Sequence, residues 1–176
     1  MNYHNILHDN MLNGEGLRVV LFTSGCSHNC YNCHNPQTWN CNSGIPFDIK
    51  AREEIFEQLD KDYISGITFS GGDPMHENNL SDTLQLIMDI KAEYKDKTIW
   101  LYTGYTWEEL INPIEKDWKY YVRRTILEKC DVLVDGKFEQ ELSDIKYMWA
   151  GSTNQRIIDV KDSLRQNKVI DKSFTM

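Results

Sequence analysis

Three of the five cysteines of this chain lie within eight residues, directly after an apolar segment. The segment 18–23 (RVVLFT) is typical of a buried β-strand, and the cysteines that follow it, Cys26, Cys30 and Cys33, have the spacing C-x3-C-x2-C. Three thiolates can ligate three irons of a 4Fe–4S cluster and leave the fourth iron open, whereas clusters that only transfer electrons usually have four cysteines. We therefore expect these cysteines to bind a 4Fe–4S cluster with one open iron.

A zinc site is the main alternative for this group of cysteines. It would use the same three thiols with His28, His34 or Cys41 as the fourth ligand. Zinc sites usually contain two cysteine pairs that are well separated in sequence, and this chain has no distant second pair. Cys130 abuts a predicted strand and is expected to be a small core residue, while Cys41, in a loop near Trp39, is expected to be a reactive or a spare thiol and not a ligand.

The rest of the chain alternates short apolar segments with helical patterns. The predicted strands are residues 18–23, 66–70, 98–103, 131–135 and 156–160, and the predicted helices are residues 48–60, 80–94 and a segment from Thr106 to Ile126 that Pro113 interrupts. This alternation predicts an α/β fold with a mainly parallel sheet of about five strands. A complete eight-unit α/β barrel takes about 250 residues. A barrel built from 176 residues must therefore be incomplete and laterally open.

Composition and the absence of repeats limit the classes of protein to which the chain can belong. We expect one domain over residues 1–160 and a C-terminal tail of unknown structure over residues 161–176. A formal charge of −8 argues against a nucleic-acid partner, because that affinity depends on Lys and Arg side chains that neutralise phosphates. No apolar run approaches the roughly 20 residues of a membrane helix, and the first residues lack the pattern of a secretory signal. We expect a cytoplasmic protein without a membrane partner.

A glycine-rich turn follows the second predicted strand. Gly71 and Gly72 would let a ligand approach the backbone closely, and Asp73 and Pro74 complete the turn. An ordinary strand-to-helix turn is the alternative, because Gly, Asp and Pro are all common in turns. Since this strand is expected to lie next to the strand that precedes the cysteines, we predict that the turn contacts a cofactor.

Small and hydrogen-bonding residues also gather before the last predicted strand, in the segment 149–156 (WAGSTNQR). Ser152, Asn154 and Arg156 could reach a ribose or a carboxylate, although a polar turn with an exposed arginine explains the same residues. Two further turns, at residues 102–105 and 134–137, also follow predicted strands. Active sites of α/β proteins are built at the carboxyl ends of their parallel strands, so we predict one site at that edge of the sheet.

The cysteine spacing after a strand resembles the radical S-adenosylmethionine superfamily. Further stretches in the same order extend the resemblance over roughly residues 1–160 to the family of proteins that activate anaerobic ribonucleoside-triphosphate reductases; they are residues 2–4, 13–16, 43–47, 103–105, 133–138 and 151–156. The resemblance implies that the open iron chelates the amino and carboxylate groups of S-adenosylmethionine. It further implies that the glycine-rich turn holds the methionine amino group, with Asp73 where most members have Glu.

The same resemblance places Asn32, Cys33, His34 and Gly72 at positions that contact S-adenosylmethionine. Asn32 departs from the superfamily, in which an aromatic residue commonly precedes the last cysteine, so adenine packing must come from elsewhere, such as His34 or the backbone.

The implied reaction is a one-electron cleavage of S-adenosylmethionine that yields methionine and a 5′-deoxyadenosyl radical. That radical would take a hydrogen atom from a glycine of the reductase, with flavodoxin or a similar protein as the electron donor. An open barrel suits such a substrate, because a loop of another protein needs a mouth through which to enter. The alternatives are activation of another glycyl-radical enzyme such as pyruvate formate-lyase, an iron–sulfur electron-transfer module and a zinc-stabilised interaction protein.

Overall fold

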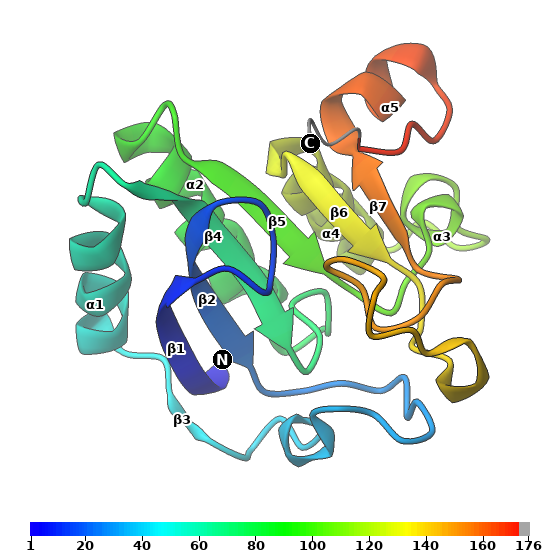
Figure 1. Ribbon diagram of the computed structural model, residues 1–176, viewed down its shortest axis with the longest axis horizontal. Coiled ribbons are helices and arrows are strands. Elements are labelled where there is room, and N and C mark those ends of the chain that lie inside the picture. Colours follow the sequence, from blue (N-terminus) through cyan, green and yellow to red (C-terminus); the bar gives the residue numbers. More distant parts are fainter. Residues whose placement is uncertain (173–176) are drawn as a thin grey trace.

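The computed structural model describes residues 1–172 and shows an α/β protein with a mixed sheet that does not close into a barrel (Figure 1). Seven strands have the spatial order β3-β1-β2-β4-β5-β6-β7. Their bounds are β1 (Asn2–Asn10), β2 (Leu17–Thr23), β3 (Ile45–Pro46), β4 (Ile64–Gly71), β5 (Thr98–Tyr102), β6 (Val132–Asp135) and β7 (Arg156–Asp159). The helices are α1 (Ile49–Leu59), α2 (Leu80–Glu93), α3 (Trp107–Ile111), α4 (Trp118–Lys129) and α5 (Val160–Gln166), with two 3-10 turns, η1 (Pro36–Thr38) and η2 (Gln140–Leu142).

The sheet differs from the expected five-stranded, mainly parallel one at its two edges. β2, β4, β5 and β6 are parallel neighbours, as the alternation of strands and helices predicted. β7 is antiparallel to β6, because the connection over residues 136–155 contains no α-helical crossover and returns the chain at the edge where β6 ended. β1 and β3 are antiparallel additions at the other edge. They escaped the sequence analysis because β1 is largely polar and buries only Tyr3 and Ile6.

The helix boundaries follow the capping signals that the sequence contains. The side chain of Asp48 accepts a hydrogen bond from the backbone N–H of Ala51 at the start of α1. Thr106 and Glu109 form the capping box expected at the start of α3. α3 ends at Ile111, just before Pro113, and α4 resumes the helix at residue 118. The predicted interruption of this helix is therefore confirmed.

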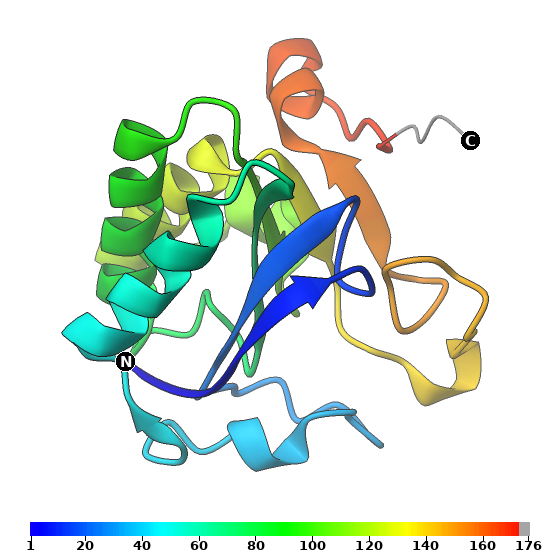
Figure 2. The same ribbon diagram turned by 60° about the vertical axis from the view of Figure 1, so that its left-hand side comes forward.

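Helices α1, α2 and α4 cover one face of the sheet, and loops at residues 11–16 and 136–155 lie over the other (Figure 2). Side chains alternate between the faces, as they must along a strand. The helix-covered face holds the main core, which includes Val19, Leu21, Ile67, Phe69, Ile99, Leu101, Leu133 and Cys130. The opposite face has a smaller cluster made of Trp100, Val132, Val134 and Ile157. Cys130 is thus the small core residue that was predicted.

A fully buried arginine closes the loop-covered face at the amino end of the strands. The guanidinium of Arg18 donates to the hydroxyl groups of Thr68 and Thr98 and to the carbonyl oxygens of Glu15, Ile67 and Thr98. All of these acceptors are neutral. Burial lowers the pKa of Arg18 to about 10. The carboxyl end of the same face is left open for a site.

The described part of the expected C-terminal tail contains regular structure. α5 begins at Val160, next to the predicted domain boundary, and the chain after it returns so that Asp171 bridges to Ile158 of β7. Residues 173–176, the last four of the tail, lie outside the described residues. Over residues 1–172, no helix is long and apolar enough to cross a membrane.

Candidate functional site

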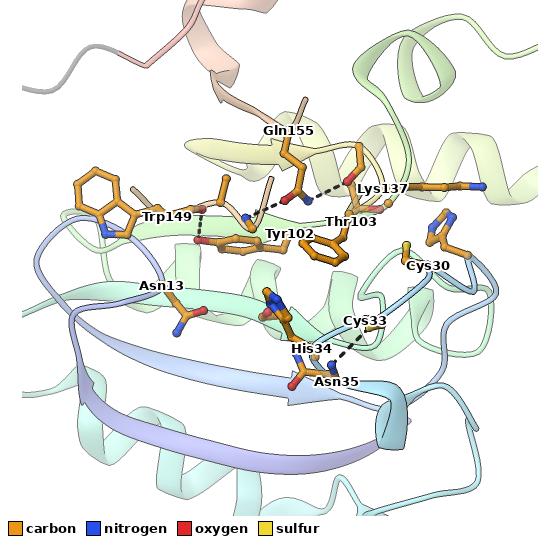
Figure 3. A pocket seen from close by; sticks show the side chains of 18 of the residues that line it. Asn13, Cys30, Cys33, His34, Asn35, Tyr102, Thr103, Lys137, Trp149 and Gln155 are labelled. Carbon is orange, nitrogen blue, oxygen red and sulfur yellow. Dashed lines mark hydrogen bonds between the residues drawn. The ribbon is translucent and has the colours of Figure 1, made fainter. Parts of the chain in front are cut away.

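A cavity of about 700 Å³ opens at the carboxyl edge of the parallel strands. Its lining comes from the segments that follow β2, β4, β5 and β6 and from the loops at residues 11–13 and 145–151. Figure 3 shows Cys30 and Cys33 at one end of this cavity and Asn13 and Trp149 at the other. The structure therefore brings together the turns that the sequence analysis placed at this edge.

The three cysteines of the C-x3-C-x2-C segment, Cys26, Cys30 and Cys33, all line the cavity. The segment lies in a loop of residues 24–35, which we call the cysteine loop. Backbone hydrogen bonds fix the start of this loop. The N–H of Gly25 donates to the carbonyl oxygen of Thr38 at 2.7 Å, and the N–H of Cys26 donates to that of Trp39 at 3.0 Å. These bonds hold the start of the loop, including the backbone of Cys26, against the end of the 3-10 turn η1.

Two asparagines give the cysteine loop its turns. Asn29 and Asn32 have left-handed backbone conformations, with φ of 50° and 52°, which Asn adopts more readily than other residues that have a Cβ atom. Each precedes a cysteine, so the turns set the direction of Cys30 and Cys33. Asn32 is exposed, and the residues that line the cavity include His34 but not Asn32. The turn alone accounts for Asn at this position.

Burial raises the pKa of two of the three thiols. It raises the pKa of Cys26 to about 11, although the backbone N–H of His28 acts in the opposite direction. The pKa of Cys30 is also raised by burial, against the effects of the Phe138 backbone N–H and the Lys137 ammonium. Metal ions bind thiolates and displace these protons. The same N–H groups that favour the thiolate are therefore available to ligated sulfurs.

The cysteine loop suits an iron–sulfur cluster through the chemistry of its donors. Three soft thiol ligands from one loop face a single cavity, and thiolates are the ligands that hold such clusters. Among residues 1–172, no three Cys, His, Asp or Glu side chains converge closely enough to hold one metal ion. Cys41, which the zinc alternative invoked, is partly exposed and does not line the cavity.

Gly71 and Gly72 line the cavity and allow β4 to end against the cysteine loop. A Cβ atom at Gly71, where φ is +100°, would lie 2.5 Å from the backbone nitrogen of Thr23. A Cβ atom at Gly72 would lie 2.6 Å from the carbonyl oxygen of Gly25 and 2.9 Å from that of Thr38. Glycine is therefore required here by close packing, and the same lack of side chains leaves backbone groups at the cavity wall.

Asp73 points into the protein instead of the cavity. It is 1% exposed and is not part of the lining. Its Oδ1 accepts a hydrogen bond from the backbone N–H of Met75 at 2.7 Å. Its Oδ2 lies 2.7 Å from Nε2 of His28 and accepts bonds from the hydroxyl of Thr103 and the N–H of Gly104. The carboxylate joins three segments of the site to one another.

Ser152, Asn154 and Arg156 likewise lie outside the cavity lining. The hydroxyl oxygen of Ser152 accepts a bond from the N–H of Glu139 at 3.1 Å, and Nδ2 of Asn154 donates to the carbonyl oxygen of Lys137 at 2.9 Å. Arg156 pairs with Asp135 and with Glu108. These three side chains hold the segment after β6, whose residues Gly136, Lys137 and Phe138 do line the cavity.

Several lining residues were missed by sequence reasoning. Gln155 lies between the predicted residues and faces the cavity, where its Nε2 donates to the carbonyl oxygen of Gly136 and its Oε1 accepts from the N–H of Gly151. Tyr102 donates to the carbonyl oxygen of Trp149 at 2.7 Å. No periodicity signals these contacts, because each joins segments that are 4 to 47 residues apart in the chain.

An aromatic wall is formed by His34 of the cysteine loop and by residues of neighbouring segments. The rings of His34 and Phe138 have centroids 4.6 Å apart, and both residues line the cavity with Tyr102. Flat apolar surfaces, backbone groups at Gly71 and Gly72, and three thiols thus meet in one space. Such a cavity can hold a metal cluster and, beside it, an organic ligand with both polar and aromatic parts.

Comparison with known proteins gives consistent results over most of the chain. A family model described as a 4Fe-4S single cluster domain matches residues 12–158. A protein of Vibrio cholerae serotype O1 is 43% identical over 159 residues, which is 89% of this chain and 97% of that protein. A protein of Pasteurella multocida is 42% identical over 159 residues, or 89% of this chain and 96% of that protein. One of Enterobacteria phage T4 is 40% identical over 157 residues, or 89% and 93%. Each of the three is named anaerobic ribonucleoside-triphosphate reductase-activating protein.

Proposed function

The chain belongs to the family of anaerobic ribonucleoside-triphosphate reductase-activating proteins, and we propose from this that it is a radical S-adenosylmethionine enzyme that generates a glycyl radical on that reductase. One observation carries the proposal: three thiols of one loop line the same cavity as the Gly71-Gly72 turn. When bound and reduced, a 4Fe–4S cluster supplies the electron that splits S-adenosylmethionine into methionine and a 5′-deoxyadenosyl radical, which takes a hydrogen atom from a glycine of the reductase.

The protein's own part is ligation, orientation and exclusion of water. Cys26, Cys30 and Cys33 would hold three irons and leave the fourth without a protein ligand. The backbone at Gly71 and Gly72 would receive the methionine amino group, because both glycines line the cavity next to the cysteine loop.

The aromatic wall formed by His34 and Phe138 offers a flat surface to the adenine ring. Asn32 would act through the turn that it gives the cysteine loop. Ser152, Asn154 and Arg156 would act indirectly, by fixing the cavity segment after β6.

The partner and the electron donor complete the proposal. The relatives' name indicates an anaerobic ribonucleoside-triphosphate reductase as the target, and a cavity at the open edge of the sheet is accessible to a loop of such a protein. An open sheet with its site at the carboxyl ends of parallel strands also suits an incomplete, laterally open barrel of the radical S-adenosylmethionine type. Flavodoxin or a similar one-electron carrier would supply the electron in the cytoplasm.

The test is anaerobic reconstitution of the purified protein with iron and sulfide, followed by reduction with dithionite in the presence of S-adenosylmethionine and the reductase. We expect methionine as a product and an electron paramagnetic resonance signal of a glycyl radical on the reductase. Cys30→Ala should lose iron and cleavage activity together, whereas Cys41→Ala, outside the cavity, should retain both.

Other outcomes would identify the alternatives. A radical formed on pyruvate formate-lyase but not on the reductase would overturn the choice of partner. A protein that holds iron and sulfide but leaves S-adenosylmethionine intact under reduction would be an electron-transfer module. A Cys30→Ala variant with an intact cluster and full activity would refute the assignment of that cysteine as a ligand.

A further inference from the structure

His28 lies inside the cysteine loop, between Cys26 and Cys30, and is one of the residues that line the cavity. Its side chain is only 9% exposed, and its Nε2 lies 2.7 Å from Oδ2 of Asp73, which is 1% exposed. Burying the polar atoms of a His–Asp pair costs desolvation free energy unless each of them finds a hydrogen-bond partner. This histidine therefore connects the loop that carries the three thiols to the turn that ends β4.

The space around the imidazole of His28 is narrow. Its ring packs edge-on against Tyr105, with the centroids 4.7 Å apart. A Cβ atom at Gly104 would lie only 2.4 Å from Cδ2 of the same ring. Because both contacts come from the segment after β5, the histidine is held between the carboxyl ends of two parallel strands.

Asp73 receives donors from the cysteine loop and from the segment after β5. Besides His28, its Oδ2 accepts from the hydroxyl of Thr103 at 2.9 Å and from the N–H of Gly104 at 3.2 Å. Its own N–H donates to the carbonyl oxygen of Gly25 at 2.7 Å. The cysteine loop is thus tied to the turns after β4 and β5 through one buried carboxylate.

This carboxylate also places a negative charge beside the cysteine loop. Its Oδ2 contacts His28, which lies between Cys26 and Cys30, and the backbone of Asp73 is bonded to Gly25, the residue before Cys26. A fixed negative charge in a buried position is weakly screened. The electron that an iron–sulfur cluster gains on reduction would therefore be opposed by the charge of Asp73, and net charge and hydrogen bonding are among the factors that set a cluster's reduction potential.

We propose that His28 and Asp73 form a positioning pair, which fixes the cysteine loop and lowers the reduction potential of the cluster that Cys26, Cys30 and Cys33 bind. The inference rests on the proposed function only in that these cysteines hold a cluster. It assigns to Asp73 a role that acts through His28 and the loop, without contact to S-adenosylmethionine.

The test uses reconstituted full-length protein without S-adenosylmethionine. Asp73→Asn keeps an acceptor for the N–H of Met75 but removes the charge, so its cluster should have a more positive midpoint potential in a redox titration followed by electron paramagnetic resonance. His28→Ala should lose iron to a chelator about 10-fold faster than the wild type, since removing a residue that supports metal ligands typically costs 10- to 100-fold in affinity.

Two further variants separate positioning from general damage to the fold. His28→Gln can still donate to Asp73 and should recover much of the iron retention. Gly104→Ala changes neither member of the pair but displaces the ring, so it should resemble His28→Ala. The control is His8→Ala, which removes a half-exposed histidine paired with Glu54 and should behave as the wild type.

The inference is overturned if His28→Ala, Gly104→Ala and Asp73→Asn all match the wild type and His8→Ala in iron retention and midpoint potential. Should Asp73→Asn fail to fold, His28→Gln and Gly104→Ala decide by the same two readouts. The proposed function fails separately, and visibly, if the wild-type protein itself assembles no 4Fe–4S cluster.

Discussion

Arg156 donates from Nε to Oδ1 of Asp135 at 3.0 Å, and this ion pair lies beside the cavity, outside its lining. Asp135 is 1% exposed and also accepts the N–H of Trp107 at the start of α3. Glu108 forms a second ion pair with the same arginine. Together the two carboxylates raise the pKa of Arg156. The sequence left open whether this arginine reaches a ligand or belongs to a polar turn, and in the structure it pairs with a buried carboxylate at the end of β6.

We therefore predict that Arg156→Ala reduces stability more than it reduces affinity for S-adenosylmethionine. Removing one member of a buried pair leaves the other charge uncompensated, but the arginine is one-third exposed and water screens part of the effect. The free energy of unfolding in urea should fall by about 2 kcal/mol.

The double variant Asp135→Asn/Arg156→Ala should regain part of that loss, because it also removes the uncompensated charge. If Arg156→Ala instead unfolds like the wild type but binds S-adenosylmethionine more than 10-fold more weakly, the arginine contacts the ligand directly.

A second prediction concerns Gly72. A Cβ atom at this position would collide with the carbonyl oxygen of Gly25, in the cysteine loop, and with that of Thr38, in the segment after the loop. Gly72→Ala should force that loop away from β4, lower the iron content after reconstitution and cost about 1–3 kcal/mol of stability.

Gly136→Ala is the matched comparison for Gly72→Ala. Gly136 has a φ of +91° but nothing within 4 Å of the added carbon, so only backbone strain of about 1–2 kcal/mol is expected, with the iron content unchanged. Equal iron contents in the two variants would show that the contact between β4 and the cysteine loop does not position the thiols.

The central part of the fold could be predicted from the sequence because its signals are local. Each of these signals is contained in a short stretch of sequence. They are the apolar segments of β2, β4, β5 and β6, the capping box at Thr106 and the helix break at Pro113. β1 and β7 were missed or misjudged because strand direction and edge pairing depend on contacts between distant segments. Nothing within the segment 156–159 specifies that it runs antiparallel to β6.

In the candidate site, too, features with a local sequence signal could be predicted and features that depend on tertiary contacts could not. The three thiols and the two glycines, Gly71 and Gly72, could be identified because each group directly follows a predicted strand. All five residues line the cavity. Side-chain direction was not identifiable. In the segment 152–156, Ser152 and Asn154 turn towards the backbone of residues 137–139, while Gln155, the residue after Asn154, faces the cavity. Ser, Asn and Gln side chains can each bind either a ligand or a backbone group. Only tertiary packing decides which of the two a given side chain contacts.

Arg18 gives a third prediction, since all of its hydrogen-bond acceptors are neutral. Arg18→Lys keeps the charge but has three donors on a point-like group in place of a planar fork of five. Some of the acceptors around Thr68 and Thr98 would lose their donor, which costs about 1–3 kcal/mol for each buried group left without a partner.

Chemical denaturation should therefore show a clear loss of stability for Arg18→Lys. Arg165→Lys, at an exposed i,i+3 pair with Asp162, should change stability by less than about 0.5 kcal/mol. Equal stabilities of the two variants would mean that the charge of Arg18 matters and its five-bond geometry does not.

Asp131 allows a prediction about pH. Burial alone would raise the pKa of this carboxyl group, but hydrogen bonds from Lys161, Lys91 and the backbone N–H of Ile99 outweigh burial and lower it. Its pKa in the folded protein therefore lies below the value of about 3.9 in the unfolded chain. As pH falls, the unfolded chain takes up the proton first, so the stabilisation is complete above about pH 4 and is lost as pH falls through the folded value.

Asp131→Asn should accordingly lower the free energy of unfolding at pH 7 by about 1–3 kcal/mol, and the difference from the wild type should shrink as pH is lowered below about 4. Urea unfolding at pH 7, 5 and 3.5 measures this difference directly. Asp162→Asn, a half-exposed carboxylate with a neighbouring arginine on the same helix, should show almost no difference at any of the three values. A gap between Asp131→Asn and the wild type that stays constant from pH 7 to 3.5 would mean that Asp131 stabilises the fold by hydrogen bonding that does not need its charge.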